Sequence, residues 1–386
     1  LFGSGGAPLF AIARGSGDKA RAGLILNLAC TLLLCCAGVL MVIGLLFGRP
    51  ILVLFGASPE ALQYALPYLM LYLLGTYPSM LTTGLNPFIN AQGYATAGML
   101  SVVIGAAANL VLDPVFIFVL GMGVRGAAAA TVLSQLLSAA FVVYFLRCKS
   151  EYRVQPLPLR QLPANRRCIG DIVSLGTAGF IMQLTNSVVT ICCNNILSVT
   201  GGDIYISVMT IISSVRQLVE TPIHAMVEGT SPILSYNYGA RRPDRVKKTI
   251  KLAVCYAEGI MLIGFCIFQF FPDKVLGIFA ASDAMLAIGI PALRIICPHF
   301  LLAGASIVLS SVFQALGNGI FSLIVSVCRQ LFVLLPAAWL LAQTGNVNNV
   351  WWAFLIAEVV SLLLSLAFFA RINKTVIAPL YGPEEP

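Results

Sequence analysis

Apolar runs of about 20 residues follow one another along the whole chain, separated by short polar stretches. A run of this length crosses the ~30 Å hydrocarbon layer of a membrane as a helix, which satisfies its own backbone hydrogen bonds there. The pattern therefore predicts an all-α polytopic membrane protein. Whole spans are predicted at 24–47, 64–89, 95–120, 124–147, 168–197, 204–236, 246–271, 285–315, 320–342 and 349–372, and residues 1–13 are predicted to end a further span.

The two halves of the chain repeat each other. Residues 3–14 align with residues 227–238 at an offset of 224, which places Pro8 over Pro232. The same offset aligns Gly15 with Gly239 and 90–93 with 314–317, and Pro114 falls near Pro336 with a drift of two residues. A duplicated apolar half, with an even number of spans between landmarks, is typical of a secondary transporter built from two parallel repeats. Because the first residues match the end of the span at 204–236, we expect twelve spans in the intact protein, about eleven of them visible here.

The composition agrees with a protein dissolved in lipid, because 59% of the residues are hydrophobic and only 10% are charged. A soluble domain carries about 25% charged residues. Of the 23 Lys and Arg, 17 lie in segments that helix counting places on one side of the membrane: 14–21, 147–167, 241–251 and 371–374. The positive-inside rule makes that side cytoplasmic, together with both termini. No aromatic or Gly-rich binding pattern accompanies these basic segments, so they do not indicate a nucleic-acid partner.

The only long polar, Pro-rich stretch divides the chain. We predict an N-lobe at 1–147, a cytoplasmic linker at 148–167, a C-lobe at 168–373 and a short, loose cytoplasmic tail at 374–386. Residues 50–62 are predicted to lie as an amphipathic segment at the outer membrane surface.

Asp113 is the sharpest candidate for chemistry, because an ionisable group at membrane depth needs a compensating partner or a function. Asn109 lies four residues earlier on the same helix face, and Pro114 removes a helical hydrogen bond to the carbonyl of Leu110. A carbonyl, an amide oxygen and a carboxylate are hard ligands that suit Na⁺, and the carboxylate could instead take up a proton. A purely structural Asp is the alternative.

The second half carries further polar groups at membrane depth. Arg216 and Glu220 are spaced as an i,i+4 ion pair. His224 and Glu228 have the spacing of a metal pair, but no third ligand is evident, so no metal beyond a possible Na⁺ is expected. Glu220, Glu358, Arg329 and Gln183 are the candidates for a functional role in this half. His299 is expected to be a core histidine whose ring nitrogens are satisfied by its neighbours.

Several motifs together resemble one known family. Residues 228–242, which contain Pro-Ile-Leu-Ser-Tyr-Asn-Tyr-Gly-Ala-Arg-Arg, are similar to the signature after the eighth helix of bacterial MATE multidrug exporters. Residues 109–118 and 121–128 resemble the fifth and sixth helices of that family, and residues 313–319 resemble its tenth-to-eleventh turn. The resemblance covers essentially the whole chain. It is closer to the MepA-like and DinF-like bacterial members than to the NorM type.

The resemblance implies two six-helix lobes and alternating access. It implies a multi-pass antiporter of the bacterial plasma (inner) membrane that exports cationic, aromatic or amphipathic drugs or toxic metabolites in exchange for Na⁺ or H⁺, without a cofactor and as a monomer. In DinF-like members the cation site uses an Asp of the first helix together with residues that correspond here to Asn86, Asn109, Asp113 and Thr131. NorM-type members use an acid of the seventh helix, where this chain offers Gln183 but no acid after Asp171.

Two other functions compete with transport of drugs. A lipid-linked oligosaccharide flippase of the same superfamily must hold a pyrophosphate, which calls for several Arg or Lys in its cavity. This chain has three at membrane depth, Arg216, Arg294 and Arg329. A membrane enzyme is disfavoured because the chain has two histidines and no Ser-His-Asp or metal triad.

Overall fold

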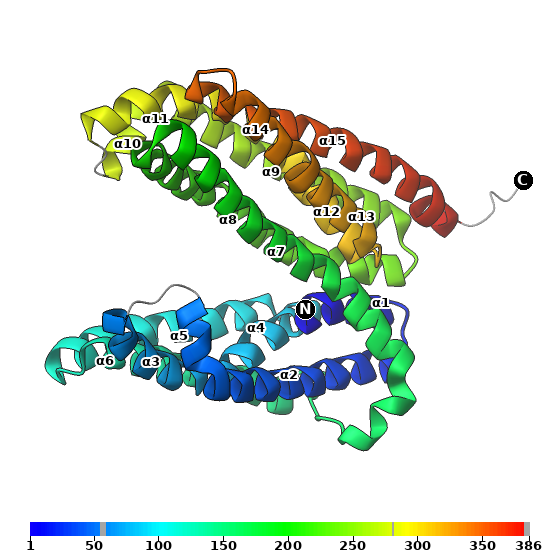
Figure 1. Ribbon diagram of the computed structural model, residues 1–386. Helices are drawn as coiled ribbons and strands as arrows, with labels where there is room; N and C mark the ends of the chain where they lie inside the picture. The colour runs from blue at the N-terminus through cyan, green and yellow to red at the C-terminus, as the bar shows by residue number, and fades with distance from the viewer. Residues whose placement is uncertain (55–58, 280–281, 382–386) are drawn as a thin grey trace, which may run out of the picture. The chain divides into compact units, whose positions relative to one another are not determined.

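A computed structural model describes residues 1–54, 59–279 and 282–381 of the chain. These residues form helices joined by short turns, and no strand occurs among them (Figure 1). They divide into two compact units, Leu1–Gly176 (unit 1) and Thr177–Pro386 (unit 2). The fold is therefore an all-α polytopic architecture, as the hydrophobic pattern predicts. The predicted lobe boundaries at 147 and 168 remain a prediction, since the division between the units falls inside a helix.

Unit 1 is built from six helices and the beginning of a seventh. They are α1 (Phe2–Gly15), α2 (Lys19–Leu54), α3 (Pro59–Leu73), α4 (Thr76–Ala91), α5 (Ala95–Pro114), α6 (Gly123–Tyr144) and the first turns of α7 (Arg166–Gly201). Its core is formed by α1, α2 and α4, where the ring of Phe10 meets those of Phe88 and Tyr152 edge to face at 5.6 and 5.2 Å.

Unit 2 contains the rest of α7 and eight further helices. They are α8 (Asp203–Gly239), α9 (Pro243–Phe270), α10 (Pro272–Ile278), α11 (Asp283–Ile296), α12 (Phe300–Ala315), α13 (Gly319–Val327), α14 (Leu335–Ala342) and α15 (Trp352–Ile372). Figure 1 shows α8, α9, α12 and α15 running side by side, in agreement with their contacts. One apolar cluster lies among α8, α9 and α12, and a second surrounds the buried Trp351.

The turns of the two units repeat each other at the offset seen in the sequence. The N–H of Tyr94 donates to the carbonyl of Ile89, and Gly93 has a φ of 91°; 224 residues later Gly317 has a φ of 79° in the equivalent turn. Gly17 likewise has a φ of 80°, and the residue 224 positions later is Arg241, with a φ of 51°. The sequence repeat is therefore a repeat of backbone conformation.

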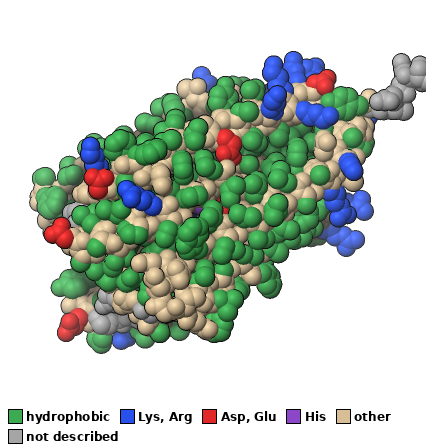
Figure 2. All heavy atoms as spheres, turned by 90° about the horizontal axis from the view of Figure 1, so that it is seen from above, with side chains coloured by type: hydrophobic (Ala, Val, Ile, Leu, Met, Phe, Trp, Pro, Cys, Tyr) green, Lys and Arg blue, Asp and Glu red, His purple; other side chains and the backbone are tan. Residues whose placement is uncertain are grey.

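Eight segments of the described residues are long and apolar enough to cross a membrane, judged by length and composition. They are Lys19–Leu54, Ala95–Val119, Gly123–Lys149, Leu159–Val199, Pro243–Phe270, Asp283–Ala315, Gly319–Ala342 and Val347–Tyr381. Large hydrophobic side chains are exposed along them, and Figure 2 shows such side chains over most of one face, with Lys and Arg gathered toward its ends. Exposed apolar surface of this extent fits a lipid environment.

The other two of the ten predicted spans are helical as well, but each differs from a continuous apolar helix. The span at 64–89 is interrupted at Leu74 and Gly75, which leaves α3 and α4 with 15 and 16 residues. The span at 204–236 lies within α8, which is long enough at 37 residues but carries several charged side chains. Both segments therefore fall outside the eight apolar ones.

The polar stretch after α6 is held against unit 1. The backbone N–H of Tyr152 donates to Gln92 Oε1 at 3.0 Å, that of Gln155 to Asn27 Oδ1 at 2.8 Å and that of Leu157 to Thr31 Oγ1 at 2.8 Å. This part of the predicted linker is thus an ordered strap over the ends of α2 and α4, fixed through its backbone.

Two segments that the sequence predicts to be interfacial or loose are helical in the structure wherever they are described. Residues 50–54 complete α2 and residues 59–62 begin α3, while 55–58 of the predicted interfacial segment lie outside the described residues. Residues 374–381 of the predicted loose tail are helical, with Ile377 buried and the Tyr381 hydroxyl donating to Asp244 Oδ1 at 2.9 Å. Residues 382–386 lie outside the described part of the chain.

Candidate functional site

The Asn109–Asp113 pair of unit 1 lies in the last turns of α5, where the backbone geometry changes. Pro114 ends the α-helix because it has no N–H to donate, and the π-helical segment η1 (Val115–Val119) follows. Single π-helical turns inside membrane-length helices occur often at functional sites. Here the change of geometry directly follows the one carboxylate of α5.

The two polar side chains of this turn have buried atoms without partners. Asp113 Oδ1 and Asn109 Nδ2 are both buried and make no hydrogen bond to any described residue. An unpaired buried polar atom costs roughly 1–3 kcal/mol, and more when the group is charged. The unpaired carboxylate oxygen of Asp113 is therefore suited to a cation or a proton that the protein does not itself provide, whereas the amide N–H group of Asn109 needs an acceptor.

Thr131 of α6 lies at the same level as this turn. Helices α5 and α6 run antiparallel: Gly126 lies against the carbonyl of Phe116, and Ser138 Oγ donates to the carbonyl of Ser101 at 2.6 Å. Thr131 lies between these two contacts on α6, as Asn109 and Asp113 do on α5. Its hydroxyl donates to the carbonyl of Ala127 at 2.9 Å, which leaves the oxygen lone pairs available as an acceptor or ligand.

Asn86 of α4 is not brought to this turn. Its Nδ2 donates to Ser101 Oγ at 2.6 Å and to the carbonyl of Gly98 at 2.8 Å, and its Oδ1 accepts from Asn90 at 3.2 Å. Ser101 precedes Asp113 by 12 residues of one continuous helix, which is about 18 Å at 1.5 Å per residue. Asn86 and Asp113 therefore occupy different levels of unit 1, and Asn86 is engaged by protein partners.

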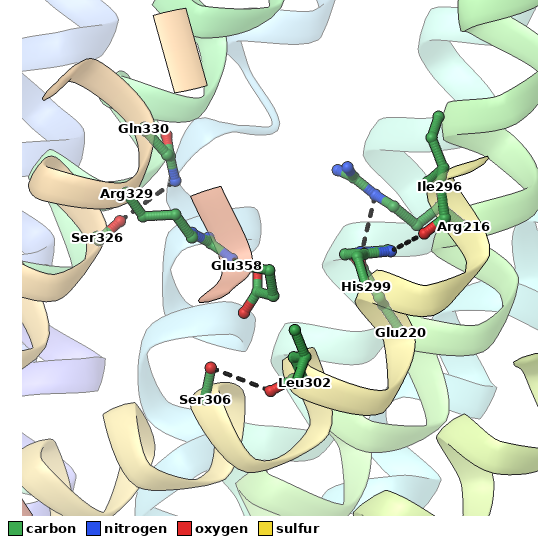
Figure 3. Close-up of polar contacts among 10 residues, drawn as sticks. All are labelled: Arg216, Glu220, Ile296, His299, Leu302, Ser306, Ser326, Arg329, Gln330 and Glu358. Carbon is green, nitrogen blue, oxygen red and sulfur yellow. Dashed lines mark hydrogen bonds and ion pairs between the residues drawn. The ribbon is translucent and has the colours of Figure 1, made fainter. Parts of the chain in front are cut away.

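A group of charged side chains lies inside unit 2, between α8 and the α11–α12 junction (Figure 3). Arg216 Nε lies 3.1 Å from Glu220 Oε1 on the same helix, which is the i,i+4 pair that the sequence predicts. His299 Nε2 lies 3.8 Å from the same Glu220 oxygen. The other ring nitrogen, Nδ1, lies 3.1 Å from the carbonyl oxygen of Ile296.

A second pair lies nearby on the helices that follow. Arg329 Nη1 donates to Glu358 Oε2 at 3.2 Å, and Glu358 is 4% exposed, so this acid depends on its Arg for compensation. Gln330, next to Arg329, donates to Ser326 Oγ at 3.2 Å (Figure 3). Of the four candidates in this half, Glu220, Glu358 and Arg329 thus carry ion pairs in unit 2.

The remaining polar candidates do not join this group. Gln183 is exposed on α7, where its Oε1 accepts from Asn186 at 3.5 Å. His224 and Glu228 are exposed on α8, and no group of three metal-ligating side chains occurs among the described residues. Glu258 of α9 accepts from the backbone N–H of Ala305 at 2.7 Å and so ties α9 to α12.

The contact between His299 and Glu220 is the feature of this group that the sequence did not indicate. The two residues lie 79 positions apart, and Pro298 marks the break between α11 and α12 that turns the imidazole toward α8. A Pro-His step between two apolar helical runs is the only local signal, and it does not identify the partner.

Comparison with known proteins gives the family. The family model described as MatE matches residues 1–115 and 179–340. "Multidrug export protein MepA" of Staphylococcus haemolyticus (strain JCSC1435) is 25% identical over 366 residues, which cover 95% of this chain and 80% of the relative.

Solved structures of transporters have the same fold as this chain. One described as an outward-facing conformation of a multidrug resistance MATE family transporter of the MOP superfamily has a TM-score of 0.89 at 26% identity and covers all of this chain and 84% of its own. A MOP superfamily transporter from Pyrococcus furiosus, described as having a binding pocket of reverse polarity that suggests a different function, has the same TM-score and identity and covers 98% of this chain and 84% of its own. Because the family model covers most of the chain, the chain belongs to the MatE family of membrane transporters.

Proposed function

We propose that the protein is a secondary active antiporter that exports cationic, aromatic or amphipathic drugs or toxic metabolites in exchange for Na⁺ or H⁺ by alternating access. The family supports transport, and the MepA relative is described as a multidrug export protein. An antiporter needs a site where the coupling ion binds and is released as access alternates.

The coupling site that we propose is the α5 turn with Asn109 and Asp113, together with Thr131, which lies at a similar level of α6. The observation that carries this proposal is the carboxylate oxygen Asp113 Oδ1, which is buried without a hydrogen-bond partner. Na⁺ would take the carboxylate, the Thr131 hydroxyl oxygen and an amide oxygen as ligands, while a proton would neutralise the carboxylate alone. Asn86, held at another level of unit 1, is left out of this set.

The proposed substrate class rests on the MepA relative, which is described as a multidrug export protein. A cation is attracted by a carboxylate without a partner, such as that of Asp113, and by aromatic rings, which make up 10% of the chain. The reverse pocket polarity described for the Pyrococcus furiosus transporter makes the sign of the substrate charge the property to test first.

The flippase alternative is not favoured by the distribution of cations. A pyrophosphate needs several Arg or Lys that are free to bind it. In the described part of unit 2, Arg216 and Arg329 are each paired with an acid at 3.1 and 3.2 Å. Those guanidinium groups are therefore already largely neutralised.

The test is efflux from proteoliposomes that contain the full-length protein and an imposed Na⁺ or pH gradient, read with ethidium and a matched anionic dye. We expect gradient-driven export of the cationic dye with one of the two gradients. No effect of either gradient on the movement of ethidium, together with transport of a lipid-linked pyrophosphate, would establish the flippase.

Asp113→Asn keeps the shape of the side chain and removes its charge, so it should reduce gradient-driven efflux to the level of protein-free liposomes. Asp273→Asn is the matched control, because Asp273 is an exposed acid at the start of α10. Full efflux by Asp113→Asn at equal reconstitution would make Asp113 structural and leave Glu220 or Glu358 as the next carboxylate to test.

A further inference from the structure

Helix α9 presents one continuous exposed face. Its buried residues recur every three or four positions, as Val246, Ile250, Ala253 and Ala257 do, and they pack into unit 2. Residues on the opposite side of the helix are exposed along its length. This side, the outer face of α9, carries basic residues at its beginning and apolar residues after them: Arg245, Lys248, Lys251, Leu252, Ile263 and Phe270.

The apolar part of the outer face has the length of a membrane interior. From Leu252 to Phe270 the helix rises by about 27 Å at 1.5 Å per residue, close to the ~30 Å of the hydrocarbon layer. Glu258 is the one charged residue in this stretch, and its carboxylate turns to α12, where it accepts from the backbone N–H of Ala305 at 2.7 Å. With the apolar part in the hydrocarbon layer, the three basic side chains lie at the level of the lipid headgroups.

The basic side chains of the outer face form no ion pair with any residue that the structure describes. Residues 241–251 contain six Lys or Arg and a single acid, Asp244. The Tyr381 hydroxyl donates to Asp244 Oδ1 at 2.9 Å, and the Tyr381 ring centroid lies 4.5 Å from Lys247 Nζ. The end of the chain thus covers the flank of α9 that carries this acid, and the outer face keeps an excess of positive charge.

The matching face of α2 in unit 1 is covered by the chain itself. At the offset of 224, Asn27 of α2 corresponds to Lys251 of α9, and Thr31 corresponds to Cys255. Asn27 Oδ1 and Thr31 Oγ1 each accept a backbone N–H of the strap, both at 2.8 Å. Their counterparts on α9 are exposed. The repeat position that unit 1 closes with its strap is therefore open in unit 2, and it is basic there.

We propose that the outer face of α9 binds an anionic phospholipid, with its phosphate against Arg245, Lys248 and Lys251 and its acyl chains along Leu252 and Ile263. Guanidinium and ammonium groups form charge-assisted hydrogen bonds to phosphate oxygens. A lipid also supplies the apolar chains that this face requires below its basic end, whereas a soluble phosphate does not enter the hydrocarbon layer. This site goes beyond the proposed function, which concerns the coupling ion and the exported compound.

The test reads lipid contact at the outer face itself. In the full-length protein every cysteine other than Cys255 is replaced, and Cys255, which is exposed on this face, is labelled with bimane. The protein is reconstituted in phosphatidylcholine vesicles with increasing fractions of phosphatidylglycerol brominated in its acyl chains, or of phosphatidylcholine brominated in the same way. Bromine quenches the label only at close range. We expect half-maximal quenching at a mole fraction about fivefold lower for the phosphatidylglycerol, the effect of one basic side chain near the surface, or lower still.

The contribution of the basic side chains is tested in one variant that combines Arg245→Gln, Lys248→Gln and Lys251→Gln. These three side chains are exposed, so their replacement leaves the packing of α9 intact. The two brominated lipids should quench the label equally in this variant. Preferential quenching by phosphatidylglycerol that survives all three substitutions would overturn the assignment of the phosphate to these residues.

The matched control removes the same charge from the basic segment after α6, which helix counting places on the same side of the membrane. It combines Lys149→Gln, Arg153→Gln and Arg160→Gln, all of them exposed, and it should keep the preference for phosphatidylglycerol. An equal loss of preference in both variants would show attraction by total charge alone and would overturn the proposal, as would equal quenching by both lipids in the unsubstituted protein. A label that neither lipid quenches would mean that another part of the chain or a second copy covers this face, which also contradicts it.

Discussion

The Arg329–Glu358 pair of unit 2 contains a carboxylate that is buried. Glu358 is 4% exposed, and its second oxygen, Oε1, is buried without a hydrogen-bond partner. Removing Arg329 leaves a buried carboxylate uncompensated, which in soluble proteins costs about 3–5 kcal/mol. Replacing both partners by apolar residues of similar size removes that penalty.

We therefore expect Arg329→Met to destabilise the protein by about 3 kcal/mol and Arg329→Met/Glu358→Met to recover most of that loss. The measurement is thermal unfolding in detergent, with Arg125→Met as the control, since Arg125 is an exposed residue at the beginning of α6. Equal destabilisation by the single and the double variant would show that the arginine stabilises by packing rather than by charge.

How far the sequence predicts contacts at this scale depends on their separation along the chain. The Arg216–Glu220 pair is predictable because a helix brings positions i and i+4 together whatever the rest of the fold does. The Nδ2–Oγ contact between Asn86 and Ser101 across the α4–α5 turn determines the level of unit 1 at which Asn86 lies. The resemblance to the family matched Asn86 by residue type alone, which could not determine this level. The position of His299 against Glu220 depends on how α11 and α12 break and pack against α8, which no local pattern encodes.

At the scale of elements, the positions of helices were predictable and their irregularities were not. Long apolar runs determine that α2, α6 and α9 exist, because only a helix satisfies the backbone in lipid. The interruption between α3 and α4 contains no Pro, and its sequence, Leu74-Gly75, also occurs inside continuous helices. The strap at residues 150–157 is held by backbone donors bound to side chains of α2 and α4, so its order depends on tertiary contacts.

The duplicated turn before α9 provides a prediction at this scale. Arg241 has a φ of 51°, in the left-handed region, where its repeat counterpart is Gly17 with a φ of 80°. A side chain in this region costs about 1–2 kcal/mol relative to Gly, part of which the greater freedom of unfolded Gly offsets. Arg241→Gly should therefore raise the free energy of unfolding by about 1 kcal/mol.

The control for this prediction is the neighbouring residue. Arg242 has a φ of −112°, which any residue adopts, so Arg242→Gly removes the same charge without relieving strain and should destabilise slightly. Both variants are compared by the midpoint of thermal unfolding at the same salt concentration. A lower midpoint for Arg241→Gly than for Arg242→Gly would contradict the backbone argument.

At the scale of the whole molecule, the two units and the distribution of charge make a prediction about topology. The basic segments at 14–21, 147–167, 241–251 and 371–374 fall on one side of the membrane if every apolar segment spans it, including α8 and the interrupted α3–α4 segment. The loops at the other ends, such as the one after α14, then face outward. The even number of spans in each repeat requires that Pro8 and Pro232, which lie inside α1 and α8, approach the same face.

This topology is tested with single cysteines in the full-length protein. Of the eleven cysteines of these residues, the ten others are replaced for the Cys148 protein and all eleven for the Gln343→Cys protein. Cys148 is exposed in the basic segment that follows α6, and Gln343 is exposed at the end of α14. A membrane-impermeant maleimide added to intact cells should label Gln343→Cys and should label Cys148 only after the membrane is permeabilised. Because one lipid bilayer separates the two positions in the proposed topology, labelling of both in intact cells, or the reverse order, would contradict it. Labelling of both positions would mean that an even number of segments crosses the membrane between them, as would be the case if α8 did not cross; the α3–α4 segment precedes both positions and does not affect this comparison.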